Sequence, residues 1–508
     1  MLLTHAALVF TFLSPVASQQ TCATGLPIRL VIGNCSIPGI SAYGIQLGIG
    51  ETVQAEVCGA VSTVSNSTLF MSRELCEDDG LKNPRISQRQ CSSRRGGLID
   101  WNDFSAFNAD GQISELMTLN PSWVTLMRLE GLDPFKHALK APLNLGGRTI
   151  TTLEGVVTQG TNHSLHHIGL GGESSLLTEL VDKDVITGRS WSVNVGSTSY
   201  LFPREGSLVL GGKDDNSYEG NLIYFPFNRG ERPVKQRQCP LQVSTTDLTI
   251  RMTVNGTEVA PLRYNDSTVT SGFCIESYDT HLRLGPSKVN DIIRAAGIKL
   301  VNRADYPGLY NLEEGLVFPS STELTMTMEI TIENKFTVII PSHELVNPLR
   351  GLDTDGKFAV APEYTEIGVF RSDPLEDSAV LGKAFLSQVY LYVDWDKEKF
   401  ALAKQKQRSD IAPVLTPSGP CSSSGSQGTD RKTTIGLIAG VSALAFVTLG
   451  MLAVLIWFYR RYIRNQNRDG SADPGPTPPG PAPPDVPRGG GFGQIIHAWA
   501  SGRTSGRQ

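Results

Sequence analysis

The chain has 508 residues, a formal net charge of -5 and 19% charged residues. This length allows one large two-part body with additional segments rather than a single small domain. The composition carries no strong basic field, so nucleic acid is excluded as an expected partner.

The first segment, residues 1–18, is predicted to be a signal peptide. It contains a short apolar run followed by Val16 and Ser18, small residues that suit cleavage before Gln19. A basic start is missing, since only His5 precedes the run. A short N-terminal core element is the competing interpretation. The signal peptide predicts that the following chain is secreted or lumenal.

The body of the chain is predicted to be all-β with few short helices. Short runs of alternating apolar and polar residues recur between turn residues, as in Ser190–Val195, Thr246–Val254 and Leu324–Ile340. Period-two alternation with β-branched residues is typical of strands. The clearest helical patterns are short and lie at Ser175–Val181 and Lys288–Ala296.

The cysteines and glycosylation motifs also indicate an oxidising compartment. All eight cysteines precede the long apolar segment near the C-terminus, and no CxxC pair occurs, which argues against a zinc knuckle. The cysteines are Cys22, Cys35, Cys58, Cys76, Cys91, Cys239, Cys274 and Cys421. Candidate N-glycosylation sites are Asn34, Asn66, Asn162, Asn255 and Asn265.

The C-terminal part is predicted to cross a lipid bilayer once. Residues 409–433 are rich in Ser, Gly and Pro and read as a stalk. Residues 434–459 are long and apolar enough for a transmembrane helix, and the arginines after them place the tail, 460–508, in the cytoplasm. Within this disordered tail, Pro474–Pro487 favours polyproline II and is either a ligand for SH3 or WW domains or a solvated segment without a partner. The sequence thus predicts a type I protein of the plasma membrane or of a vacuolar or other internal membrane.

Five segments resemble, in order and spacing, the motifs of the pepsin-like aspartic peptidase family. The residues within these motifs are most similar to those of fungal relatives. The five segments are Tyr43–Gln54, His167–Gly172, Gly206–Gly220, Cys274–Pro286 and Val380–Asp394. The resemblance covers about residues 28–404 and implies a bilobal double β-barrel. The lobes are expected at 19–230 and 231–408. The separation from each expected active-site loop to the later apolar-apolar-Gly element is nearly equal in the two halves, which suits a duplicated architecture.

The chemistry of that family requires two carboxylates that face each other and share one proton, each from an Asp-Thr/Ser-Gly loop. No such tripeptide occurs in this chain. Alignment from the preceding glycines puts Val61 at the first position, and valine cannot ionise. In the second loop the position falls on Glu276, or on Ser277 when counted back from the following proline. Tyr278 replaces the glycine, and Asp279 is off register.

The family resemblance also bears on the disulfides. Cys239 and Cys274 flank a stretch that resembles hairpins of the second lobe, so they are candidates for pairing. Cys76 and Cys91 would close a small loop. The other four cysteines stay unassigned.

The histidines His163, His166 and His167 form a cluster that invites a metal-binding interpretation. Because the segment leads into an expected buried strand, loop and strand-edge histidines are the favoured interpretation, and no metal or other cofactor is expected. Ser164 suggests a Ser/His pair, but no G-x-S-x-G elbow supports it.

These observations predict a membrane-anchored aspartic-peptidase homologue that is catalytically inactive and binds a peptide or protein in its cleft. One alternative is an active acidic endopeptidase with an atypical dyad, for example Asp279 with an unrecognised acid. Another is a surface receptor that signals through its Pro-rich tail.

Overall fold

The computed structural model describes residues 25–50, 55–63, 65–66, 68–73, 76, 87–100, 106–107, 137–146, 148–158, 165–228, 239–265, 272–301, 310–311, 315–371, 379–407, 412–418 and 460. The predicted signal peptide, the predicted transmembrane segment 434–459 and the predicted tail after residue 460 lie outside these residues. Among the described helices, none combines the length and the apolar character needed to cross a bilayer. Residues 1–423 form one compact unit and 424–508 a second.

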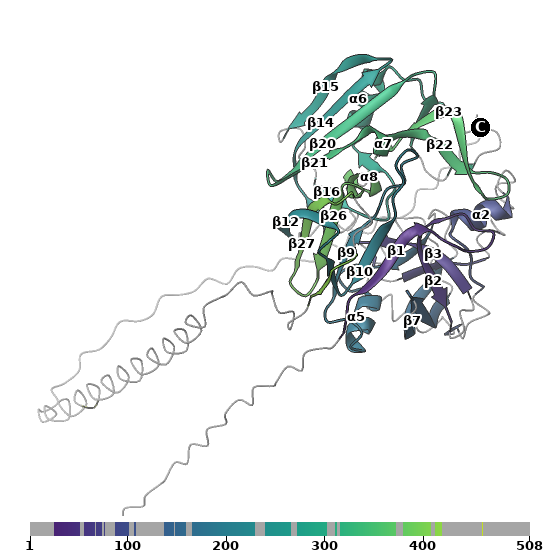
Figure 1. Ribbon diagram of the computed structural model, residues 1–508, viewed down its shortest axis with the longest axis vertical. Coiled ribbons are helices and arrows are strands. Elements are labelled where there is room, and N and C mark those ends of the chain that lie inside the picture. The colour runs from purple at the N-terminus through teal and green to yellow at the C-terminus, as the bar shows by residue number, and fades with distance from the viewer. Residues whose placement is uncertain are drawn as a thin grey trace, which may run out of the picture. The chain divides into compact units, whose positions relative to one another are not determined.

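Strands dominate the described part, as the alternating patterns predict (Figure 1). Up to residue 226 they are β1 (Ile28–Asn34), β2 (Tyr43–Ile49), β3 (Ala55–Ser62), β4 (Thr68–Met71), β5 (Ala106–Phe107), β6 (His137–Leu145), β7 (Arg148–Thr158), β8 (His166–Gly169), β9 (Ser190–Asn194), β10 (Gly206–Leu210), β11 (Gly212–Asp214) and β12 (Tyr218–Pro226). From residue 242 to 311 they are β13 (Gln242–Val243), β14 (Thr245–Val254), β15 (Thr257–Asn265), β16 (Phe273–Ile275), β17 (Leu282–Leu284) and β18 (Tyr310–Asn311). The remainder are β19 (Leu316–Pro319), β20 (Leu324–Ile332), β21 (Phe336–Ile340), β22 (Val346–Leu352), β23 (Phe358–Ile367), β24 (Val369–Arg371), β25 (Ala379–Leu381), β26 (Val389–Asp394), β27 (Lys399–Gln405) and β28 (Leu415–Pro417).

One arrangement of four strands occurs twice in the chain. In the amino-terminal half the order is β3-β8-β4-β7, and in the carboxyl-terminal half it is β16-β25-β17-β24. In both sets the first pair is parallel, the second antiparallel and the third parallel. The first set belongs to a 13-stranded sheet, and the second lies in a five-stranded sheet with β13. This repetition agrees with the nearly equal motif separations in the sequence.

Strand β20 shows why the alternating sequence gives this fold. Every second residue from Leu324 to Ile332 is buried, while most of the residues between them are half-buried. Successive side chains of a strand point to opposite faces, so one face of β20 joins the core. Together with β14, β15 and β21 it forms a four-stranded sheet, and β18, β22, β23 and β19 form another.

Five short helices are described: α2 (Gln88–Arg94), α5 (Ser175–Asp182), α6 (Pro286–Ala296), α7 (Ser342–Leu345) and α8 (Lys383–Leu386). Helix α6 begins with proline and ends at Gly297, whose φ of 60° is the left-handed conformation that glycine adopts easily. Its buried residues Val289, Ile292 and Ala296 recur every three or four positions, which places them on one face of the helix. Helices α5 and α6 match the two helical patterns found in the sequence.

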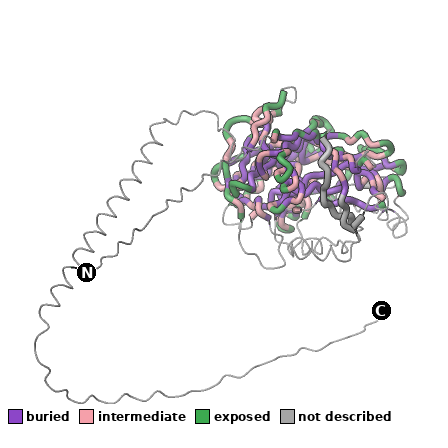
Figure 2. Tube along the Cα trace, turned by 90° about the horizontal axis from the view of Figure 1, so that it is seen from below, coloured by how far each residue is buried: buried purple, intermediate pink, exposed green. Residues whose placement is uncertain are grey.

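The two halves share one hydrophobic core, whose buried residues extend from Ile28 to Leu402 (Figure 2). They also meet at α2 and the hairpin β22–β23, which lie side by side in Figure 1. Ser87 Oγ donates to Thr354 O at 2.8 Å, and Gln90 Nε2 donates to Leu352 O at 3.1 Å.

Part of the segment 409–433, which the composition predicts to be a stalk, forms a strand. Leu415–Pro417 forms β28, which pairs with Gly212–Asp214 of β11. Asp214 Oδ1 also accepts a hydrogen bond from Val414 N at 2.9 Å. Ser and Pro are typical of linkers, but the edge of β11 offers unpaired backbone groups that order these residues.

Candidate functional site

The candidate site is formed by two loops that follow β3 and β16 and interlock. Thr63 Oγ1 donates to Ile275 O at 2.8 Å, and Ser277 Oγ donates to Val61 O at 2.8 Å. Each loop therefore sends one hydroxyl to the backbone carbonyl of the other. The two contacts are reciprocal, so Thr63 corresponds to Ser277, and the residues before them, Ser62 and Glu276, correspond to each other.

The strand registers give the same correspondence. In the first half Val61 pairs with Ile168 and Ser62 with Gly169. In the second half Ile275 pairs with Leu381, the residue before Gly382. Each loop thus leaves its strand beside an apolar-Gly element, as the family resemblance implies.

The structure places Ser62, rather than Val61, opposite Glu276. Val61 is the last apolar residue of the buried strand, and its carbonyl, not its side chain, takes part in the interlock. The alignment from the preceding glycines is therefore one residue off in this half. Thr63 and Ser65 keep the second and fourth residues of the family phrase D-T-G-S, a signal that selects Ser62 as the first.

Glu276 is buried and held by donors from both loops. Its Oε1 accepts hydrogen bonds from Thr63 N at 3.0 Å and from Tyr278 N at 2.9 Å. Ser62 Oγ donates to Oε2 at 3.3 Å and accepts from Ser65 N at 3.1 Å. Backbone N–H donors favour a charged carboxylate. The two equivalent positions thus present one carboxylate and one hydroxyl.

Ser277, the residue that the alternative alignment of the second loop selects, makes a different contact. Because its hydroxyl is the donor to Val61 O, it corresponds to the threonine of the family motif. Asp279, the other acid considered, is bonded to His281 N at 3.1 Å and to the Arg283 guanidinium.

Tyr278 stands where the family has glycine, and its side chain contacts the other half. Its ring lies 3.7 Å from that of His167, centroid to centroid, and its hydroxyl accepts a hydrogen bond from Leu165 N at 3.3 Å. The bulky residue therefore fits by extending towards β8, and it adds a further contact between the halves.

His166 is a buried strand histidine. Its Nδ1 accepts from Met71 N at 3.1 Å, and its Nε2 lies 3.2 Å from Gly97 O, to which it donates in the neutral tautomer. Burial lowers the pKa of His166 to about 3, against the raising effect of the Gly97 carbonyl. His166 is thus neutral and structural, while His163 and Ser164 lie outside the described residues.

Three disulfides are present among the described residues. Cys76 is bonded to Cys91 and Cys239 to Cys274, the two pairs that the sequence suggested. A third disulfide, which the sequence left unassigned, joins Cys35 to Cys58. Cys22 and Cys421 lie outside the described residues.

Three of the candidate glycosylation sites, Asn34, Asn255 and Asn265, are exposed. Asn66 is half-buried, and its Oδ1 accepts a hydrogen bond from Glu173 N at 3.1 Å. Asn162 lies outside the described residues.

Comparison with known proteins supplies the deciding observation. Residues 153–405 match the profile of the family described as eukaryotic aspartyl protease. The chain belongs to the pepsin-like aspartic peptidase family. It is 22% identical over 239 residues to Candidapepsin-1 of Candida albicans strain WO-1 and, to the same extent, to the secreted aspartic protease 1 of Candida albicans. The match covers 47% of this chain, which spans about half, 51%, of the length of these relatives.

Within this family the chain departs from the pattern at the residues that carry the reaction. The family motif supplies an aspartate from each loop, whereas the equivalent positions here hold Ser62 and Glu276. A serine hydroxyl does not ionise at ordinary pH, so it cannot share a proton with a carboxylate as a second acid would.

Proposed function

We propose that this chain is a non-catalytic aspartic-peptidase homologue that is anchored in a membrane and binds a peptide or protein between two lobes. The observation that carries the proposal is the pairing of Ser62 with Glu276. Peptide hydrolysis in this family needs one carboxylate as base for a water molecule and a second as acid for the carbonyl. With a hydroxyl at one position, the second acid is lost.

The two-lobed arrangement is part of the proposal. Its support is the repeated four-strand pattern and the reciprocal contacts of the two loops. An extended peptide can bind between such lobes through backbone hydrogen bonds, which do not depend on the catalytic pair.

The membrane anchor rests on the sequence of residues 434–459 and on the signal peptide pattern at the start of the chain. The word "secreted" in the name of the relative from Candida albicans agrees with a lumenal or extracellular body. Loss of the chain from the membrane fraction after deletion of 434–459 would support the anchor, whereas retention in that fraction would contradict it.

The proposal is tested by incubating the purified full-length chain with a mixed peptide library between about pH 3 and 6, with and without an active-site inhibitor of aspartic peptidases. The natural chain is expected to give no inhibitor-sensitive cleavage. The double variant Ser62→Asp with Glu276→Asp restores the two acids and serves as the matched positive control. Inhibitor-sensitive cleavage by the natural chain would overturn the proposal and favour the active-peptidase alternative.

A further inference from the structure

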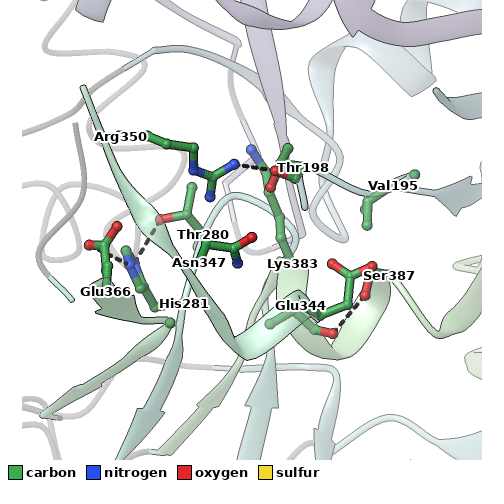
Figure 3. Close-up of a pocket in the computed structure, with 13 residues that line it drawn as sticks. Val195, Thr198, Thr280, His281, Glu344, Asn347, Arg350, Glu366, Lys383 and Ser387 are labelled. Atoms are coloured by element: carbon green, nitrogen blue, oxygen red, sulfur yellow. Dashed lines mark hydrogen bonds and ion pairs between the residues drawn. The ribbon is translucent and has the colours of Figure 1, made fainter. Parts of the chain in front are cut away.

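A pocket lies next to the candidate site, where Thr280 follows the Glu276 loop (Figure 3). Two cations, Arg350 and Lys383, and two carboxylates, Glu344 and Glu366, line it. These opposite charges cancel, so the charge of the pocket singles out no class of ligand. A more specific relationship links the two ends of the body.

The described part of the body begins at Gly25 and ends at Ser418, and both ends contact adjacent residues. A Cβ at Gly25 would lie 2.7 Å from the backbone nitrogen and the Cα of Ile186. The next residue, Thr187, donates through Oγ1 to Ser418 O at 2.7 Å. Ser418 N donates in turn to Gly211 O at 3.1 Å. The two ends of the body are therefore neighbours.

A second set of contacts places the two ends side by side. Gly212 lies between them, because a Cβ at this position would be 3.0 Å from Pro27 Cγ and 2.3 Å from Thr416 O. In the ladder of β11 and β28, Gly212 pairs with Pro417. The beginning and the end of the body thus meet on one small patch around Ile186 and Gly212.

Each end leads within three positions to a cysteine. Cys22 precedes Gly25, and Cys421 follows Ser418. The other six of the eight cysteines are bonded to one another in three pairs. Cys22 and Cys421 are thus the two that these pairs leave over. Both precede the predicted transmembrane segment, so both are expected in the oxidising compartment that favours disulfides.

The chain between each end of the body and its cysteine is long enough for the two cysteines to meet. Three extended residues span about 10 Å. A disulfide requires Cα atoms that are about 4.4–6.8 Å apart. Because both short segments start from the same patch, neither has to cross the body to reach the other. Cysteines that followed from distant points of the body would fail this test.

We propose that Cys22 and Cys421 form a fourth disulfide, which joins the start of the chain after the predicted signal peptide to the segment after β28. Two thiols are oxidised to one S–S bond. Their two electrons and two protons pass to a protein disulfide of the oxidising compartment, which is reduced to a dithiol. The bond closes a loop around nearly the whole body. It also holds β28 on the edge of β11, so a pull on the predicted membrane anchor meets a covalent bond as well as hydrogen bonds.

The test is peptide mapping of the purified full-length chain by mass spectrometry, after alkylation of free thiols and digestion with trypsin without reduction. Cys22 is the only cysteine of the tryptic peptide that ends at Arg29, and Cys421 is the only cysteine of the peptide Ser409–Arg431. We expect these two peptides as a linked pair that separates on reduction. Recovery of either cysteine in alkylated form, or bonded to a different cysteine, would overturn the proposal.

Single variants test whether the two cysteines depend on each other. Cys22→Ser should release one alkylatable thiol per chain, at Cys421, and Cys421→Ser should release Cys22. Cys76→Ser is the matched control, because it should release Cys91 and leave the linked pair intact. If Cys22→Ser does not increase the alkylation of Cys421, the proposal is wrong. A natural chain that runs as a disulfide-linked dimer on a non-reducing gel through either cysteine would also overturn it.

Discussion

The hydroxyl of Ser62 lies 3.3 Å from a carboxylate oxygen of Glu276, across the contact between two loops that are 214 positions apart in the chain. Both residues are buried, and each holds the same place in its loop. A hydroxyl is neutral, so it does not repel the neighbouring carboxylate. Two carboxylates at this distance would repel each other unless they shared a proton.

Ser62→Asp should therefore make the stability of the chain depend on pH. Repulsion from Glu276 raises the folded-state pKa of the carboxyl pair above its unfolded value. The variant should match the natural chain near pH 3 to 4 and become less stable as the pH rises through the folded pKa. Each unit of pKa elevation corresponds to about 1.4 kcal/mol. Urea unfolding at pH 4 and pH 7 measures the difference; equal stabilities relative to the natural chain at both values would contradict it.

For His166 we expect the opposite dependence of stability on pH. Its pKa is about 3 in the folded chain and about 6.5 when unfolded, so the unfolded state binds more protons between these values. The stability of the natural chain should fall as the pH drops from about 6.5 towards 3, by up to about 1.4 kcal/mol per unit. His166→Gln, which can accept from Met71 N and donate to Gly97 O, should flatten this slope in urea titrations. An unchanged slope would show that His166 is not its source.

Gly382 should not tolerate a side chain. A Cβ at this position would lie 2.2 Å from His281 O and 2.4 Å from Asp279 O, both backbone atoms. Gly382→Ala should lower the free energy of unfolding by about 1–3 kcal/mol. Gly368→Ala is the control, because its Cβ would lie 3.7 Å from Glu344 O and Leu345 O, which is ordinary van der Waals contact, and its effect should stay within about 0.5 kcal/mol. Similar denaturation midpoints for the two variants would contradict the close packing.

Tyr278 should contribute to stability mainly through its ring. Tyr278→Phe removes the acceptor for Leu165 N and should cost about 0.5–1.5 kcal/mol, while the ring against His167 remains. Tyr278→Gly restores the family residue but removes the ring, and should cost about 3–5 kcal/mol. Chemical denaturation separates the two. A Tyr278→Gly chain as stable as the natural one would mean that the contact with His167 adds nothing.

The disulfides should differ in their contribution according to the loop that each one closes. The pair Cys239–Cys274 spans 35 positions and Cys76–Cys91 spans 15. By loop entropy, replacing both members with alanine should cost about 4 kcal/mol for the first pair and about 3 kcal/mol for the second. Denaturation of the two double variants tests the order. A larger loss for the shorter loop would show that strain or packing outweighs chain entropy.

Several features of the molecule followed from local sequence patterns. The alternation in Leu324–Ile340 gave β20 and β21, and the period of Lys288–Ala296 gave α6, because these patterns report directly which face is buried. The Cys-Ile-x-Ser phrase pointed to Glu276, which lies beside Ser62 in the structure.

Other features depend on contacts between distant segments. The sequence alignment selected Val61 rather than its neighbour Ser62. A shift of one residue along a strand moves each side chain to the other face of the sheet but leaves the composition unchanged, so composition does not reveal the shift. The β28 pairing and the pocket around Arg350 involve residues separated by 150 positions or more, as in the contact between Arg350 and Thr198, which are 152 apart. No local pattern carries this information.

The hydrogen bonds between the α2 region and the β22–β23 hairpin affect the order in which the chain can fold during synthesis. Gln90 and Leu352, which they join, are 262 positions apart, so their formation must wait until most of the body has left the ribosome. Ser87, the N-terminal capping residue of α2, likewise reaches its acceptor, Thr354 O, only then. The amino-terminal half is therefore synthesised before α2 can make its contacts with the hairpin. Completion of its folding depends on synthesis of the carboxyl-terminal half.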